Sequence, residues 1–114
     1  MNARSYLMFL EDILESIGKI EAYIGDMEYD TFIDDGKTVD AVVRNLEIIG
    51  EASNKLPDEI KEKISVIPWH RMTGLRNIIA HEYFGIDLKI IWKIVKENLP
   101  EVKPSLDKLL KESQ

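Results

Sequence analysis

The chain has no cysteine and no long uninterrupted apolar run. The missing cysteine excludes a disulfide framework and a thiolate zinc site. No apolar stretch approaches the roughly 18 residues that a membrane-spanning helix needs, and no signal-peptide pattern follows Met1. These absences predict a cytoplasmic protein without a membrane partner.

Positive charge is also scarce, because the formal net charge is −6 at pH 7. This sign argues against avid nonspecific binding of nucleic acid. The acids are unevenly placed. Residues 1–35 carry nine acids and two bases, a net charge of −7, whereas the rest of the chain carries thirteen bases and twelve acids, a net charge of +1. The simplest interpretation is a solvated acidic first helix, which leaves room for a local basic cleft elsewhere.

The chain does show helical periodicity nearly throughout. Apolar residues recur at steps of three and four, which predicts a first helix over about residues 3–25 and a second over about residues 37–55, ended by Pro57. Short helical turns are expected near residues 31–33 and over residues 58–63.

The C-terminal half shows the same pattern with clearer boundary residues. Pro68 suits the first position of a helix because it has no backbone donor to lose there, and this helix is expected to end near Gly85. Asp87 suits the N-cap of the last long helix, which Pro100 and Pro104 should break or kink. No strand alternation, repeat or linker divides the chain, so the prediction is one domain, 1–114, folded as an all-α up-and-down bundle.

Only two histidines occur, and one of them lies in the most informative stretch of the chain. His81 follows Arg76 by five residues, with Asn77 between them and Tyr83 two places further on. At 100° per residue, Asn77 falls about 40° from His81, whereas Arg76 falls about 140° from His81 and close to Tyr83. Arg76 and His81 can therefore meet at one phosphate if the helix bends, or if a second copy supplies the partner across a two-fold axis.

An arginine and an imidazole are the two groups needed to cut an RNA phosphodiester without metal, so no cofactor is expected. The ribose 2′-hydroxyl is an internal nucleophile, and its proximity supplies much of the rate advantage. In this hypothesis His81 transfers a proton, Arg76 stabilises the phosphorane, and Asn77 orients the imidazole. His70 and Arg71 on the same helix could enlarge the basic patch. The spacing alone also fits a structural histidine near a helix C-terminus.

Three polar residues of the second long helix leave two interpretations open. Arg44, Glu47 and Glu51 share one face at steps of three and four. They fit an exposed ladder of salt bridges, worth roughly 0.2–0.5 kcal/mol per pair. They also fit a polar face that lines the cleft, in which Arg44 contacts phosphate and Glu47 or Glu51 braces Arg76.

Other conspicuous residues have structural interpretations. Gly50 interrupts an apolar helical stripe, which predicts a close approach of another helix. Trp69 and Trp92 are interpreted as core or dimer aromatics and not as platforms for RNA bases. A metal hydrolase built on the two histidines and Glu82 is disfavoured, because these residues lack the i, i+4 histidine spacing of a helical zinc site.

The stretch from Arg76 to Tyr83 resembles the R-x-x-x-x-H-x-Y motif of HEPN-domain toxins of the HepT type. The likeness extends to residues 40–52, to Ile67-Pro68-Trp69, to residues 83–87 and to Leu99-Pro100-Glu101. It therefore covers essentially the whole chain in order.

This resemblance implies a HEPN-like homodimer in which the motifs of both copies line one cleft. It implies a metal-independent endoribonuclease that acts on RNA as the toxin of a type VII-like toxin–antitoxin pair, with Arg76 and His81 as catalytic residues. The antitoxin of such a pair is a small nucleotidyltransferase, which transfers AMP from ATP to the motif tyrosine, here Tyr83. Nucleotidyl phosphates beside Arg76 would occupy the anion site that RNA needs. The alternative is a non-catalytic helical module that binds a nucleotidyltransferase.

Overall fold

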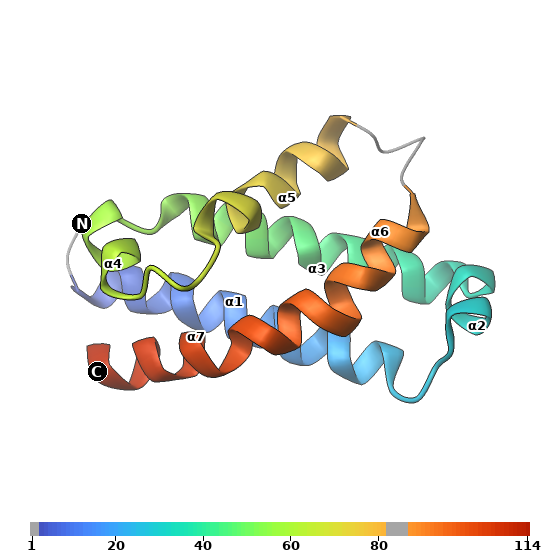
Figure 1. Cartoon of the computed structure of the whole chain (residues 1–114), viewed down its shortest axis with the longest axis horizontal. Coiled ribbons are helices and arrows are strands. Elements are labelled where there is room, and N and C mark those ends of the chain that lie inside the picture. Colours follow the sequence, from blue (N-terminus) through green and yellow to red (C-terminus); the bar gives the residue numbers. More distant parts are fainter. Residues whose placement is uncertain (1–2, 82–86) are drawn as a thin grey trace.

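Two long helices form the frame of the molecule. The computed structural model describes the backbone of residues 3–81 and 87–114, and the side chains of residues 6–77, 79 and 87–114. The long helices are α1 (Ala3–Ile24) and α3 (Gly36–Lys55), joined through the short helix α2 (Tyr29–Asp34) (Figure 1). Their bounds confirm both predicted long helices to within one residue at each end.

The remaining described elements are helical as well. They are α4 (Asp58–Lys63), α5 (Trp69–His81), α6 (Leu88–Lys93), the π-helical segment η2 (Ile94–Asn98) and α7 (Leu99–Ser113). The all-α prediction is therefore confirmed for the described parts of the chain. None of the helices in these parts is both long and apolar enough to cross a membrane.

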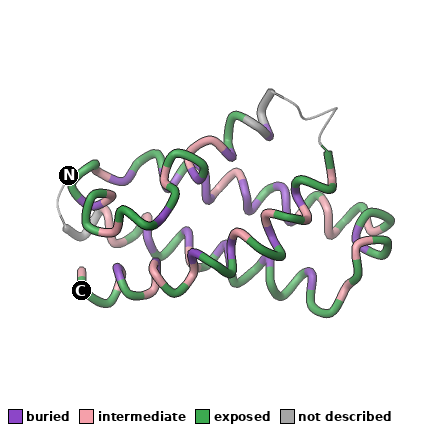
Figure 2. The backbone as a smooth tube through the Cα atoms, in the orientation of Figure 1, coloured by how far each residue is buried: buried purple, intermediate pink, exposed green. Residues whose placement is uncertain are grey.

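The core lies where α3 packs between α1 and α5, with α7 covering the other side of α1. Figure 2 shows the buried positions on the sides of the helices that face one another. The large side chains with almost no exposure are Leu10, Ile13, Ile17, Ile20, Phe32, Val42, Leu46, Ile49, Ile79, Ile91, Leu106 and Leu109. Burying each such side chain contributes roughly 1.5–3 kcal/mol, so this apolar stripe is what holds the bundle together.

Short polar residues and proline set several helix ends. Asp35 Oδ1 accepts a hydrogen bond from the backbone N–H of Thr38 at 3.1 Å and caps α3, and this bond lowers the pKa of Asp35 below its ordinary value of 3.8. Asp87 Oδ1 accepts from the backbone N–H of Lys89 at 2.9 Å, so the predicted N-cap is confirmed. The residue before Pro57 is extended, which ends α3 as predicted.

Pro68 precedes α5 and does not occupy its first helical position. Its carbonyl accepts hydrogen bonds from the N–H groups of Arg71 at 3.0 Å and Met72 at 3.1 Å, so Pro68 takes the N-cap position one residue earlier than predicted. The other end of this helix was expected near Gly85. That position lies outside the described residues, in which α5 extends to His81.

The last long helix changes direction, and it does so through a π-helical segment. Figure 1 shows the bend between α6 and α7. The N–H of Leu99 bonds to the carbonyl of Ile94, five residues back, immediately before Pro100. Pro100 has no backbone N–H to donate to the preceding turn, and the widened π-helical turn tolerates this missing hydrogen bond. The predicted kink is present, whereas the predicted break at Pro104 is wrong, because Pro104 lies inside α7.

Candidate active site

Arg76 lies at a point where α5 comes very close to α3. The residue of α3 at this point is Gly50, and a Cβ added to it would lie 2.8 Å from the backbone nitrogen of Arg76 and 3.1 Å from its Cβ. Real Cβ atoms essentially never approach another heavy atom to less than 3.0 Å, so only glycine fits. The predicted close helix–helix approach at Gly50 is confirmed, and the approaching helix is the one that carries the motif.

The apolar face of α5 fixes the rotation of this helix about its axis. Met72, Leu75 and Ile79 are buried, as the sequence predicts. Arg76 lies at the edge of that face, with its side chain 57% exposed. The backbone of Arg76 is thus held firmly against α3 while its guanidinium stays open to a ligand.

A carboxylate of α3 lies beside this guanidinium. Glu51 Oε1 is 3.9 Å from Arg76 Nε, and both side chains are about half exposed. Glu51 directly follows Gly50 in the chain, so the contact that holds the Arg76 backbone also brings Glu51 next to its side chain. An exposed pair of this kind contributes at most about 1 kcal/mol to stability, so its main effect is on the direction of the guanidinium.

The other two polar residues of α3 interact with each other. Arg44 Nη1 is 4.0 Å from Glu47 Oε2, one helical turn away. The Arg44–Glu47 pair fits the interpretation as a salt-bridge ladder, whereas Glu51 is the residue that lies close enough to brace Arg76. Contact of Arg44 with phosphate stays a prediction.

The remaining motif residues are described only in part. Asn77 is exposed on α5, and His81 is the last residue of the described helix. The imidazole of His81 and the whole of Tyr83 lie outside the described residues, so the orienting role of Asn77 and the proximity of Tyr83 to Arg76 stay predictions. α5 is continuous from Trp69 to His81, which keeps the backbone positions of Arg76 and His81 about 140° apart around the helix.

Positive charge is concentrated on two consecutive helices. α5 contains Arg71, Arg76 and both histidines without any acid, and α6 contains Lys89 and Lys93 without any acid. The other described helices each carry at least one acid and have no net positive charge. The acidic average of the chain therefore conceals a basic region that includes the motif helix.

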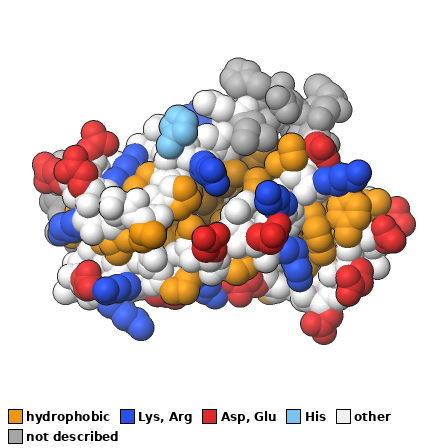
Figure 3. All heavy atoms as spheres, viewed as in Figure 1, with side chains coloured by type: hydrophobic (Ala, Val, Ile, Leu, Met, Phe, Trp, Pro, Cys, Tyr) orange, Lys and Arg blue, Asp and Glu red, His pale blue; other side chains and the backbone are white. Residues whose placement is uncertain are grey.

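A groove of about 740 Å³ runs along the side of α5 that faces η2 and α7. Figure 3 shows apolar side chains on this face of the molecule, with positive side chains beside them. The residues that line the groove are Val66, Ile67, Pro68, His70, Arg71, Met72, Gly74, Leu75, Ile94, Asn98, Leu99, Glu101, Val102 and Ser105. The sequence did not indicate this groove, because it depends on how α5 and α7 cross.

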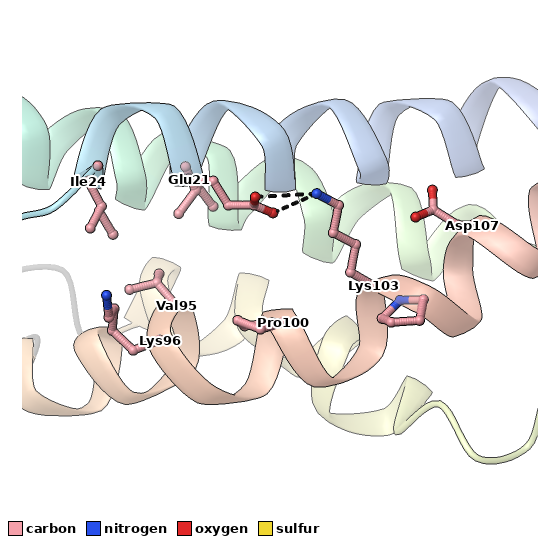
Figure 4. A pocket seen from close by; sticks show the side chains of 10 residues that line it. Glu21, Ile24, Val95, Lys96, Pro100, Lys103 and Asp107 are labelled. Atoms are coloured by element: carbon pink, nitrogen blue, oxygen red, sulfur yellow. Dashed lines mark hydrogen bonds and ion pairs between the residues drawn. The ribbon is translucent and has the colours of Figure 1, made fainter.

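A second cavity, of about 560 Å³, lies between the end of α1 and the η2–α7 region, and no residue of α5 lines it. Figure 4 shows Lys103 extending from α7 to Glu21 on α1. Lys103 Nζ donates to the two carboxylate oxygens of Glu21 at 2.9 and 3.3 Å. This pair links two helices that are far apart in the sequence, and its position away from the motif favours a structural role.

Both tryptophans have structural partners. Trp69 Nε1 donates to the carbonyls of Lys61 at 2.9 Å and Ile64 at 3.2 Å, which holds the loop that leads into α5. Trp92 packs against Phe32, with ring centroids 5.1 Å apart. The interpretation of both residues as packing aromatics is therefore confirmed. Among the side chains that the structure describes, no group of three acids or histidines is placed to hold a metal ion.

Similar proteins belong to one class of enzyme. Residues 13–109 match a family model described as Ribonuclease HepT-like. A Methanocaldococcus jannaschii protein named as a candidate RNase is 45% identical over 107 residues, covering 94% of this chain and 98% of its own length. A Thermococcus cleftensis protein named as a probable ribonuclease HepT is 44% identical over 108 residues, covering 95% and 98%. A Caldanaerobacter subterraneus protein named as a candidate RNase is 35% identical over 106 residues, covering 93% and 95%. No solved structure shows significant similarity.

Proposed function

Because the chain belongs to the family of HepT-like ribonucleases, we propose that it is a metal-independent endoribonuclease with Arg76 and His81 as its catalytic residues. The observation that carries this proposal is the close contact at Gly50, where the backbone of Arg76 has no room to move toward α3. At an ordinary helix–helix distance, position 50 would not need to be a glycine. A contact that tight supports a role in which the position of Arg76 matters.

The proposed reaction is an internal transesterification of RNA. The imidazole of His81 accepts the proton of the 2′-hydroxyl, and the 2′-oxygen attacks the adjacent phosphorus. Arg76 binds the phosphate and stabilises the extra negative charge of the phosphorane. The bond from phosphorus to the 5′-oxygen then breaks, and the leaving oxygen receives a proton from an imidazolium. One product ends in a 2′,3′-cyclic phosphate and the other in a 5′-hydroxyl.

The geometry of α5 supports a homodimer with a shared cleft. Arg76 and His81 lie on different sides of one continuous helix, so a second copy is the simpler source of the missing partner. In such a dimer each site combines Arg76 of one copy with His81 of the other. Within each site the same imidazole accepts the proton of the 2′-hydroxyl and returns a proton to the leaving 5′-oxygen.

Mixing two inactive variants tests the shared cleft. Arg76→Ala and His81→Ala homodimers should each lose at least about 100-fold in cleavage rate. After unfolding and refolding together in equal amounts, about half the dimers are mixed, and each mixed dimer has one intact site. Cleavage should return to about a quarter of the wild-type rate per total protein. No recovery, with a dimeric mass in sedimentation, would show that each site uses residues of a single copy.

Cleavage in EDTA tests the chemistry itself. The wild-type chain should cut a single-stranded RNA at the same rate with and without EDTA, and mass spectrometry of the product should show the cyclic phosphate. Complete inhibition by EDTA would establish a metal-dependent reaction. No cleavage by the folded chain in either condition would favour the non-catalytic helical module that binds a nucleotidyltransferase.

The toxin role and its neutralisation through Tyr83 rest on the resemblance in the motif. Tyr83 follows Arg76 by seven residues in the sequence, and AMP attached to its hydroxyl near the guanidinium would exclude RNA. Incubation with ATP and a nucleotidyltransferase antitoxin should add AMP to the wild-type chain and abolish its cleavage. Tyr83→Phe should stay active and unmodified, whereas Tyr23→Phe, at a tyrosine that is 42% exposed on α1, should behave like wild type. AMP found on the Tyr83→Phe chain would exclude this target.

A further inference from the structure

The groove beside α5 is the larger of the two cavities described above, and most of its lining residues are apolar. α5 packs against α3 on one side, and the groove separates its other side from η2 and α7. Its floor includes Met72, Leu99 and Val102, which are nearly buried, and its edge includes Val66, which is 75% exposed. Its volume of about 740 Å³ lies within the range of roughly 300–1,000 Å³ typical of sites for small ligands.

Positive charge lies on the α5 side of this groove. His70 and Arg71 of α5 line it, Glu101 of α7 is the one acid among its lining residues, and the neighbouring helix α6 carries two lysines and no acid. A flat apolar group attached to a phosphate matches both the apolar floor and the basic rim.

Gly74 provides an independent observation at the same place. It lies inside α5, where glycine is less favourable than alanine, and a Cβ added to it would meet nothing within 4 Å. The packing of this chain therefore does not require a glycine there, in contrast to Gly50. Gly18 on the exposed side of α1 passes the same steric test, but it lines neither of the two cavities described above. At Gly74 the missing side chain leaves the helix backbone accessible from within the groove.

We propose that this groove binds an unpaired nucleobase of the RNA substrate, with Arg71 on the phosphate next to that base. This inference rests on the proposed ribonuclease function. The base would lie on the apolar floor, and the amide of Asn98 and the hydroxyl of Ser105 are the polar groups available to its edge. A paired base cannot leave its helix to enter such a groove without losing its partner, so the site favours single-stranded RNA.

The position of the groove relative to the motif makes it a determinant of the cleavage site. Gly74 is two residues before Arg76, a separation of about 3 Å along the helix axis, and seven residues before His81, about 10 Å. A base held at Gly74 therefore belongs to a nucleotide near the linkage that is cut. We expect the identity of this base to influence which linkage is cleaved.

A direct binding measurement tests the inference with two matched glycine variants. Gly74→Leu places a side chain in the groove, and its Cβ meets nothing within 4 Å; Gly18→Leu makes the same change on the exposed side of α1, at a residue that lines neither cavity. The probe is a fluorescent single-stranded 2′-O-methyl RNA octamer, which binds but cannot be cleaved because the nucleophile is blocked. Gly74→Leu should weaken binding by about tenfold, and Gly18→Leu should not change it. Circular dichroism shows that each variant is folded.

Two further probes separate the base from the phosphate. An octamer with abasic sugars should bind equally weakly to wild type and to Gly74→Leu. Arg71→Ala should lower the salt dependence of binding by about one counterion, whereas Lys111→Ala, at an exposed lysine near the other end of α7, should leave it unchanged.

Three outcomes would overturn the inference. Wild-type affinity in folded Gly74→Leu, or equal affinity of wild type for the abasic octamer, excludes a base in the groove. A lower mass of Gly74→Leu in sedimentation, with unchanged affinity for the octamer, assigns the groove to a second copy. Cleavage of the unmodified RNA by wild type, assayed separately, shows whether the ribonuclease proposal stands when the groove proposal fails.

Discussion

Gly50→Ala is the substitution with the most informative expected outcome, because one added methyl meets the backbone of Arg76. The new Cβ would lie 2.8 Å from the backbone nitrogen of Arg76, whereas ordinary contact begins at 3.4 Å, so α5 must move away by about 0.6 Å. The atom in the way belongs to the backbone of a packed helix and cannot rotate aside. The guanidinium must therefore move with the helix.

The cost in stability and the cost in activity should differ. Overpacking of this kind costs typically 1–3 kcal/mol, and the better helix propensity of alanine offsets about 1 kcal/mol, so the net loss of unfolding free energy should be about 0–2 kcal/mol. Misplacement of a catalytic group by about 1 Å can cost about 100-fold in rate. A shift somewhat smaller than this should lower kcat/KM by about 10- to 100-fold in a chain that is still folded.

Urea unfolding and RNA cleavage by the same preparation check this expectation. Gly18→Ala is the control, because its Cβ meets nothing within 4 Å and alanine should gain up to about 1 kcal/mol in stability without a change in activity. Full activity of Gly50→Ala would show that Arg76 does not need this position. A loss of activity that merely follows the fraction of unfolded chain would show that the contact serves stability alone.

Three further expectations follow from single contacts. Glu51→Gln should lower kcat/KM by no more than about fivefold, because an exposed ion pair is worth at most about 1 kcal/mol. Glu47→Gln should have no effect, because Glu47 pairs with Arg44 and not with Arg76. A larger loss for Glu47→Gln than for Glu51→Gln would show that Glu51 is not the residue that braces Arg76. Ser53→Ala should raise the urea midpoint, with a gain of about 1 kcal/mol, because the fully buried Ser53 hydroxyl has no hydrogen-bond partner in the described structure; a loss would reveal a partner. Folding lowers the pKa of Asp35, so the cap stabilises the chain fully above pH 3.8, and this stabilisation is lost as pH falls through the lower folded pKa. Asp35→Asn should therefore flatten the pH dependence of the urea midpoint in this range. An unchanged curve would refute the capping argument.

Helix bounds could be predicted where the signal is local. Pro57 and Asp87 act on their immediate neighbours, so their effects did not depend on the rest of the molecule. The π-helical segment lies before Pro100 and between two buried residues, Ile91 and Leu99. No sequence pattern within this segment predicts the π-helical turn.

The candidate site was predictable in its residues but not in its contacts. Gly50 indicated that some helix comes close, and the motif indicated Arg76, yet nothing in the sequence joined the two. Glu47 and Glu51 were equivalent on a helical wheel, and only the crossing of α3 and α5 places Glu51 beside the guanidinium. The groove has no sequence signal at all, because its lining residues come from segments about 30 residues apart.

The attachment of α5 on one side has a kinetic consequence. Because α5 packs chiefly against α3 within the described chain, it can detach as a unit while α1, α3 and α7 keep their mutual contacts. Amide protons of α5 should then exchange with solvent earlier than those of α1 and α3. Loss of function without loss of folding would be the typical result of mild damage to this protein, since partial opening withdraws Arg76 long before the whole chain denatures.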